Sequence, residues 1–265
     1  MKTKIPHLIL ASCLCAAQSA SAALVFQMDF NDADGNQSLT DRGTTGVTGA
    51  FNENGTGTYS TDVASVNGGG YSASFSGTNG DHVNFGDINA LDGLSAFTMT
   101  AWVKSSDIDG PSGSARIVSK RTSTDGFELY YHSTDNELEF VANGGVANGG
   151  GSFTANSWTW IAVTYDGSTA NFYTGNGTTV SAGDSAALAK GAFSANSANL
   201  LIGNYRNGLR PYSGLIDNVR IYNSVEDAAS LTSIMKFNDA VAVPEPSSAA
   251  LLGLGGFALI LRRRK

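Results

Sequence analysis

Apolar and polar residues alternate over short stretches of the chain, most clearly in residues 97–104 and 215–222. In the first stretch Phe97, Met99 and Ala101 alternate with Thr98, Thr100 and Trp102. Successive side chains of a strand point to opposite faces of a sheet, so this pattern predicts half-buried antiparallel strands. Similar patterns predict further strands at Leu24–Phe30, Gly70–Phe75, His82–Phe85, Arg116–Lys120, Phe127–His132, Glu137–Ala142, Trp158–Tyr165, Ala170–Thr174 and Leu200–Gly203.

Turn signals separate these stretches. Asn-Gly or Asp-Gly pairs, which tolerate the positive φ of tight turns, occur at residues 54, 67, 79, 125, 143, 166 and 176. Many short strands with this punctuation predict an all-β fold, a two-sheet antiparallel sandwich or jelly roll. One short helix is expected near Val225–Met235, with Ser224 as its N-cap. Residues 23–240 form one domain in this interpretation, and residues 31–69 form long loops.

The N-terminus has the organisation of a secretory signal peptide. Lys2 and Lys4 precede an apolar run, and Ala20-Ser21-Ala22 is a small-residue cleavage site, so residues 1–22 are expected to be removed. An alternative is a lipoprotein signal in which Cys13 carries the lipid. Both cysteines of the chain, Cys13 and Cys15, lie in this segment, so the processed protein has no thiol for redox or thiolate–metal chemistry.

Charge differs between the ends and the body of the chain. Setting aside Lys2, Lys4, Glu245 and the basic cluster 262–265 leaves 10 basic and 22 acidic residues, a formal net charge near −12, against −7 for the whole chain. Such a body has no long-range attraction for nucleic-acid phosphates. It offers many oxygen ligands to Ca²⁺.

The C-terminal residues 241–265 combine three features. Pro244-Glu245-Pro246 is followed by an apolar run, about 247–261, and then by Arg262–Lys265. The run is shorter than the roughly 20 residues of an ordinary membrane-spanning helix, and the basic end predicts a cytoplasmic C-terminus. The order of these parts closely resembles the PEP-CTERM sorting signal. That resemblance implies processing by an exosortase-type enzyme during transit to the cell surface or extracellular matrix. A plain single-pass anchor is the alternative.

A second resemblance covers roughly residues 24–236. The order of six segments is similar to the concanavalin A-like, laminin G-type jelly-roll superfamily: Phe97–Lys104, Ile117–Lys120, Gly126–Leu129, Trp158–Gly167, Leu201–Asn204 and Gly214–Asn223. The resemblance implies a binding or adhesion module, often for glycans or protein partners and sometimes with structural Ca²⁺. Unrelated activities share this fold, so it limits function only loosely.

Catalytic candidates are few. His82 and His132 are far apart and lack metal-ligand spacing, so each is expected to be a strand surface residue. Glu137 and Glu139 should face one side of a strand, with Leu138 and Phe140 on the other. Glycoside hydrolases need two carboxylates across the scissile bond, and this pair resembles half of such a site. The alternative is a solvent-facing acidic pair, and no catalytic residue is assigned.

Four aspartates are candidate calcium ligands. Asp32, Asp34, Gly35 and Asp41 match positions 3, 5, 6 and 12 of a Ca²⁺ loop. Phe30 at its first position cannot ligate, and position 12 is Asp rather than a bidentate Glu, which excludes a standard EF-hand. A looser site would join Asp29, Asp32 or Asp41 to Asp217, where first and last strands often pair. Asp217 alternates with apolar residues and is expected to share the face of Leu215, Val219 and Ile221. A buried carboxylate needs a metal or a hydrogen-bond network, and both remain open.

A contact loop is predicted between Tyr205 and Tyr212. It is the locally basic segment of an acidic body, and its candidate ligand-binding residues are Tyr205, Arg206, Asn207, Arg210 and Tyr212.

The sequence as a whole favours an exported, non-enzymatic surface or matrix module that binds a glycan or a protein, anchored in the membrane at least transiently. A secreted carbohydrate-active enzyme on the same fold is the alternative.

Overall fold

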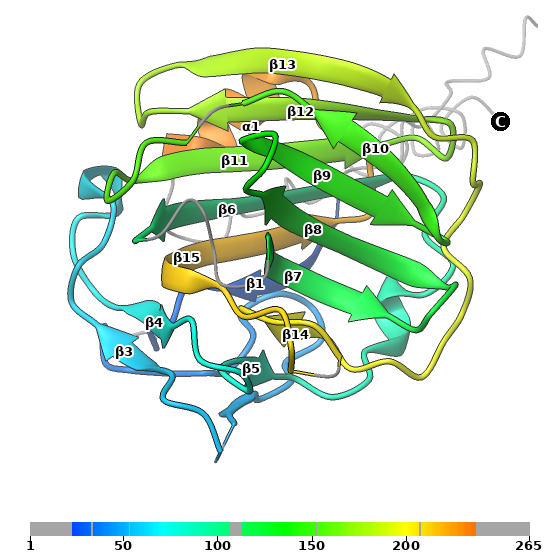
Figure 1. Ribbon diagram of the computed structural model, residues 1–265. Helices are drawn as coiled ribbons and strands as arrows, with labels where there is room; N and C mark the ends of the chain where they lie inside the picture. Colours follow the sequence, from blue (N-terminus) through cyan, green and yellow to red (C-terminus); the bar gives the residue numbers. More distant parts are fainter. Residues whose placement is uncertain are drawn as a thin grey trace, which may run out of the picture.

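The computed structural model describes residues 23–236 apart from 33, 53, 107–112, 152 and 207. Two antiparallel sheets pack face to face (Figure 1). The first sheet has the order β13-β12-β11-β6-β15-β4-β3, with β1 also paired to β15, and the second has the order β10-β9-β8-β7-β14-β5-β2. The predicted two-sheet sandwich is confirmed. The signal peptide and the sorting tail, both predicted from the sequence, lie outside the described residues.

The strands of the first sheet are β1 (Leu24–Met28), β3 (Thr58–Ser60), β4 (Ser72–Ser76), β6 (Phe97–Ser105), β11 (Thr159–Tyr165), β12 (Thr169–Gly175), β13 (Val180–Ala187) and β15 (Ser213–Tyr222). Those of the second are β2 (Ala50–Phe51), β5 (Val83–Asn84), β7 (Ser114–Arg121), β8 (Gly126–His132), β9 (Glu137–Ala142), β10 (Gly145–Gly149) and β14 (Leu201–Ile202). Two 3-10 turns, η1 (Ser65–Asn67) and η2 (Asn89–Leu91), and one helix, α1 (Ala228–Lys236), complete the described elements.

The first and last strands are neighbours, as the sequence predicts. β1 runs antiparallel to β15, with Met28 opposite Val219 and Gln27 opposite Arg220. This pairing brings residues from opposite ends of the domain into one sheet and places the acidic segment after β1 beside β15.

Aromatic residues fill much of the space between the sheets. The ring centroid of Phe97 lies 4.9 Å from that of Phe127 and 5.1 Å from that of Phe193, and Phe140 and Tyr165 extend the cluster. Burial of each such side chain contributes on the order of 1.5–3 kcal/mol. This core holds the two sheets in a fixed relation, so the side chains on their outer faces are positioned on a rigid support.

The outer faces of the two sheets are covered to different extents. Trp102 and Trp160 on the outer face of the first sheet pack against Leu231 and Met235 of α1. These tryptophans are therefore buried and offer no ring face to a ligand. In Figure 1 the outer face of β7, β8, β9 and β10 is turned toward the reader, while α1 lies on the far side of the sandwich. The second sheet thus presents its outer side chains without a covering helix among the described elements.

The helix begins later than the sequence predicts. Asp227 Oδ1 accepts the N–H of Ser230 at 2.8 Å, so Asp227 is the N-cap of α1 and Ser224 is not. The Ser224 carbonyl instead accepts the hydroxyl hydrogen of Thr98, which ties this segment to β6 before the helix can start. The short strands β2 and β3 lie in residues 31–69, where the sequence predicts long loops. Strands β10 and β13 were not predicted either, because they consist largely of small and polar residues without apolar alternation.

Candidate functional site

A β-bulge in β15 decides where Asp217 points. Asn218 has φ of 51°, and the pairing of β15 with β6 shifts register between Asp217 and Arg220. The extra residue reverses the alternation. Val219 and Ile221 therefore join the core between the sheets, whereas Asp217 lies opposite Trp102 on the outer side of the first sheet. The predicted shared face of Asp217, Val219 and Ile221 is wrong for this reason.

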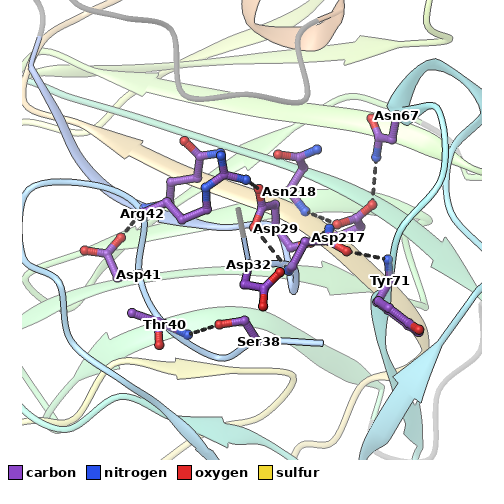
Figure 2. A network of polar contacts seen from close by, with 12 residues as sticks. Asp29, Asp32, Ser38, Thr40, Asp41, Arg42, Asn67, Tyr71, Asp217 and Asn218 are labelled. Atoms are coloured by element: carbon purple, nitrogen blue, oxygen red, sulfur yellow. Dashed lines mark hydrogen bonds and ion pairs between the residues drawn. The ribbon is translucent and has the colours of Figure 1, made fainter. Parts of the chain in front are cut away.

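Asp217 is nevertheless buried, with 2% of its surface exposed. Asn67 Nδ2 donates a hydrogen bond to its Oδ2 at 2.7 Å, and the backbone N–H of Asn218 donates to its Oδ1 at 2.7 Å (Figure 2). Burial raises the pKa of Asp217 to about 8, although both hydrogen bonds act in the opposite direction. Protein donors thus supply partners for both oxygens of this carboxyl group.

The other calcium candidates also have protein partners. Arg42 Nη1 lies 2.5 Å from Asp29 Oδ2, and burial still raises the pKa of Asp29 (Figure 2). Asp41 closes the loop after β1 by accepting the N–H groups of residues 27, 43, 45 and 46. Asp32 accepts the N–H groups of residues 34 and 36 in a local turn.

These four aspartates do not gather into one ligand set. Asp29 and Asp217 are close enough for the charge of Asp29 to raise the pKa of Asp217. Among the described residues, however, the only His, Cys, Asp or Glu group of three or more with ligand atoms within 4.8 Å of one another is His132, Asp135 and Glu139. Calcium at Asp29, Asp32, Asp41 and Asp217 remains a prediction.

The predicted contact loop divides into surface and core residues. Arg206 is exposed, and Tyr205 and Arg210 are half-buried. Tyr212 is 1% exposed and belongs to the core between the sheets, so its ring cannot stack on a ligand. Asn207 lies outside the described residues. The loop therefore offers a shorter surface than the sequence predicts, centred on Tyr205 and Arg206.

Charged side chains cross the outer face of the second sheet from β7 to β9. Glu128 is fully buried there, with Arg116 Nη2 at 3.1 Å and Arg121 Nη1 at 2.5 Å from its Oε1. The Arg116 guanidinium lies 3.9 Å from the centroid of Tyr130 and 5.5 Å from that of Tyr205. The loop after β14 thus meets the sheet through a cation–π contact. We call Arg116, Arg121, Glu128, Tyr130 and Tyr205 the polar face.

Acidic groups lie at the β9 side of the polar face. The hydroxyl of Tyr130 donates to Glu139, and burial together with this carboxylate raises the pKa of Tyr130. His132 Nδ1 is 2.9 Å from Asp135 Oδ2 and 3.7 Å from Glu139 Oε1. The sequence did not reveal this group, because its members come from β8, the following turn and β9 without metal-ligand spacing.

Glu137 and Glu139 face outward as predicted, with Leu138 and Phe140 in the core. Burial raises the pKa of Glu137, and the carboxylates of Asp135 and Glu139 add to the effect. The strand therefore carries an acidic patch at one side of the second sheet.

A pocket of about 310 Å³ adjoins the other side of the polar face. We call it the β14 pocket, and its described lining residues are His82, Asn84, Arg121, Thr122, Ser197, Ala198, Asn199, Leu201 and Arg206. Burial lowers the pKa of His82, so its imidazole is neutral at neutral pH. The pocket joins β5, the end of β7 and both segments flanking β14, which is why no local motif marks it.

Comparison with known families assigns the fold to a family. The profile described as the concanavalin A-like lectin/glucanases superfamily, of laminin G type, matches residues 76–231, more than half of the chain. The chain belongs to this superfamily. The PEP-CTERM protein-sorting motif matches residues 242–265. Both sequence resemblances are thus confirmed, and the sorting motif implies processing by an exosortase. A comparison with curated proteins finds no match.

Similar solved structures include sugar-binding and receptor-binding domains. Domain 4 of AbnA, an arabinanase from Geobacillus stearothermophilus solved in complex with arabinotriose, matches with a TM-score of 0.60 and 18% identity. That match covers 82% of this chain and 100% of the domain. The binding domain of botulinum neurotoxin serotype G matches with a TM-score of 0.61 and 14% identity.

The coverage of the toxin structures is partial. The match to the serotype G domain covers 80% of this chain but 50% of that one. The binding domain of Paraclostridial Mosquitocidal Protein 1 gives a TM-score of 0.58, 13% identity and coverage of 81% and 52%. This chain therefore spans about half the length of those domains. At these identities the likeness establishes the fold alone.

Among the described residues, no helix is both long and apolar enough to cross a bilayer. The apolar segment at about 247–261, predicted to enter the membrane, lies outside the described residues.

Proposed function

We propose that this protein is an exported, non-enzymatic module of the cell surface or extracellular matrix that binds glycans through the outer face of its second sheet. The observation that carries the proposal is the β14 pocket, with the partly exposed side chains of Arg121 and Tyr205 beside it, while α1 covers the first sheet. Saccharides are bound by planar polar groups and aromatic rings that offer hydrogen bonds and stacking faces. Tyr205, half-buried beside Arg116 and Arg206, is the ring placed to serve this role.

The buried carboxylates of the second sheet have protein partners, which supports glycan binding rather than glycan hydrolysis. A glycosidase needs one carboxyl group as a proton donor and a second as nucleophile or base. Glu128 pairs with two arginines, and Glu139 accepts the Tyr130 hydroxyl, so both carboxylates already have partners within the protein. The arabinanase domain of the same fold, described as a complex with arabinotriose, adds support for a saccharide ligand.

The proposal includes the route of the protein. A signal peptide of residues 1–22 would direct export, and the apolar segment near 247–261 would hold the protein in the membrane transiently. An exosortase would then recognise Pro244-Glu245-Pro246 and release the domain to the surface or matrix. A surface protein is the other class of ligand compatible with this position.

Glycan-array binding of the purified protein tests the proposal. We expect bound saccharides, and we expect Tyr205→Ala to abolish their binding. Tyr173→Ala is the matched control, because Tyr173 is a half-buried tyrosine on β12 that packs on the outer side of the first sheet. Binding of no glycan, or binding lost in Tyr173→Ala and kept in Tyr205→Ala, would contradict the proposal. Release of reducing sugar from a bound glycan would show an enzyme instead.

A further inference from the structure

The β14 pocket is basic in an otherwise acidic protein. Its described lining includes Arg121 and Arg206 but no carboxylate, although the body of the chain carries a formal net charge near −12. Several arginines and lysines of the described body form ion pairs, such as Arg42 with Asp29 and Lys104 with Asp62. Arg206 does not. It is exposed, donates its Nε to the Tyr205 hydroxyl at 2.9 Å, and has no ion pair among the described residues.

A second, buried source of positive charge stands beside the pocket. Arg116 and Arg121 share the single carboxylate of Glu128, so the trio has a formal charge of +1. The side chains of Arg116, Arg121 and Glu128 are 7%, 16% and 0% exposed. Arg121 also lines the pocket, so an anion bound there would lie beside this positive charge.

The neutral lining residues also favour an anion. Asn84 Oδ1 accepts the Gly86 N–H at 2.9 Å, and the Nδ2 amide of the same side chain is a donor in the pocket lining. Ser197 and Asn199 add a hydroxyl and an amide, while Leu201 and Ala198 contribute apolar surface. Donors and cations suit the oxygens of an anionic group, and the apolar surface suits the C–H face of a sugar ring.

Size favours a sugar over a lone ion. The pocket volume of about 310 Å³ is roughly ten times the share of one water molecule in the liquid, about 30 Å³. We propose that the β14 pocket binds the anionic group of an acidic saccharide, the carboxylate of a uronic acid or a sulfate ester. This inference rests on the proposed function and specifies its substrate class.

Pairs of ligands that differ only in charge provide the test. We would measure binding of the purified protein to tetragalacturonate and to its methyl ester by calorimetry, and to a sulfated and an unsulfated dextran oligosaccharide of equal length. We expect the charged member of at least one pair to bind about tenfold more tightly or better, because a charge-assisted contact is lost in the other. The pair that shows the preference distinguishes carboxylate from sulfate. The preference should weaken as salt is raised, since Arg206 is exposed to solvent.

Variants connect the preference to this pocket. Arg206→Gln should remove most of the charge preference and leave the melting temperature unchanged, because Arg206 is exposed. Lys236→Gln is the matched control: it removes the same charge from an exposed residue at the end of α1, which covers the opposite sheet. The Lys236→Gln protein should prefer the charged ligands as strongly as the unaltered protein does. Equal effects of the two substitutions would overturn the inference.

Failure of the inference is distinguishable from failure of the proposed function. If neutral and acidic members of both pairs bind equally, and Tyr205→Ala abolishes the binding of all of them, the glycan-binding function is supported and the anion pocket is rejected. Sodium galacturonate monomer, followed by the side-chain NMR signal of Arg206, tests the pocket without an oligosaccharide. A shift of that signal without binding of any oligosaccharide would support the anion pocket and contradict the glycan-binding function. No shift and no binding would reject both.

Discussion

Asp217 shows how one buried carboxyl group can make stability depend on pH. It is enclosed on the outer side of the first sheet with donors from Asn67 and Asn218. Burial raises its pKa to about 8, whereas an aspartate of an unfolded chain titrates near pH 4. The native protein therefore keeps a proton on Asp217 between these values and the unfolded chain does not. Its contribution to stability is complete below about pH 4 and is lost as the pH rises through 8.

Replacement of Asp217 by asparagine should remove this pH dependence. Asparagine resembles the protonated acid and does not titrate, so the free energy of unfolding of the unaltered protein should fall relative to Asp217→Asn between pH 4 and pH 8. The limiting slope is about 1.4 kcal/mol per pH unit. Urea unfolding at several pH values measures it. A difference between Asp217→Asn and the unaltered protein that stays constant over this pH range would show that the raised pKa is absent.

The calcium hypothesis makes a separate prediction at the same residue. A cation bound only by the native state would stabilise it by mass action. If Asp217 is a ligand, a chelator should lower the melting temperature of the unaltered protein and have little effect on Asp217→Asn. Equal melting temperatures with and without chelator in both proteins would leave the hydrogen bonds from Asn67 and Asn218 as the partners of this carboxyl group.

At the scale of elements, glycines let the strands at the side of the sandwich approach closely. A Cβ atom on Gly149 of β10 would lie 2.1 Å from Cγ of Phe172, a fully buried side chain of β12. The absence of that atom allows β10 of the second sheet to lie against β12 of the first. Small residues here are therefore a packing requirement, which also explains why β10 lacks a strand-like apolar pattern.

Gly149→Ala should destabilise the domain by about 1–3 kcal/mol, because Phe172 would have to move within a packed core. Gly150→Ala is the neighbouring control. Its Cβ would meet Asp184 Oδ2 at 2.7 Å, the far end of an exposed side chain that can rotate away. Chemical denaturation compares the two variants. Equal free energies of unfolding for both would contradict the close approach of β10 and β12.

For the whole molecule, the two faces of the sandwich differ in their cover. The first sheet is enclosed by the core on one side and by α1 on the other, whereas the second sheet has the β14 pocket beside its largely buried polar face. The domain is followed by a sorting motif, so release at the surface would present this pocket to the surroundings. Fold, sorting signal and pocket together favour a binding role outside the cell.

Export can be examined at the N-terminus of the mature protein. Cleavage after Ala22 would make Ala23 the first residue, and its backbone nitrogen donates to Asn223 Oδ1 at 2.9 Å, beside the start of β1 at Leu24. Mass spectrometry of secreted material should therefore give an N-terminus at Ala23. A diacylglyceryl group on Cys13 would establish the lipoprotein alternative and contradict this prediction.

Local patterns determined the class of fold and the sorting motif. Alternation along residues 97–104 and 159–165 specifies strands because each side chain must choose one of two faces, and the sorting motif is a contiguous signal. No local pattern marks the bulge at Asn218, yet its positive φ reverses the faces of all later residues in β15. The apolar neighbours of Asp217 in the sequence therefore did not show which face of the sheet Asp217 occupies.

Only the tertiary structure decided the candidate site. Arg116, Glu128 and Tyr205 come from three separate segments and meet because β7 pairs with both β8 and β14. Tyr205 and Tyr212 flank the same loop, but the chain turns Tyr212 into the core and leaves Tyr205 beside Arg116. Which side chains share a surface depends on pairing register and chain reversal between distant segments, and a linear pattern contains neither.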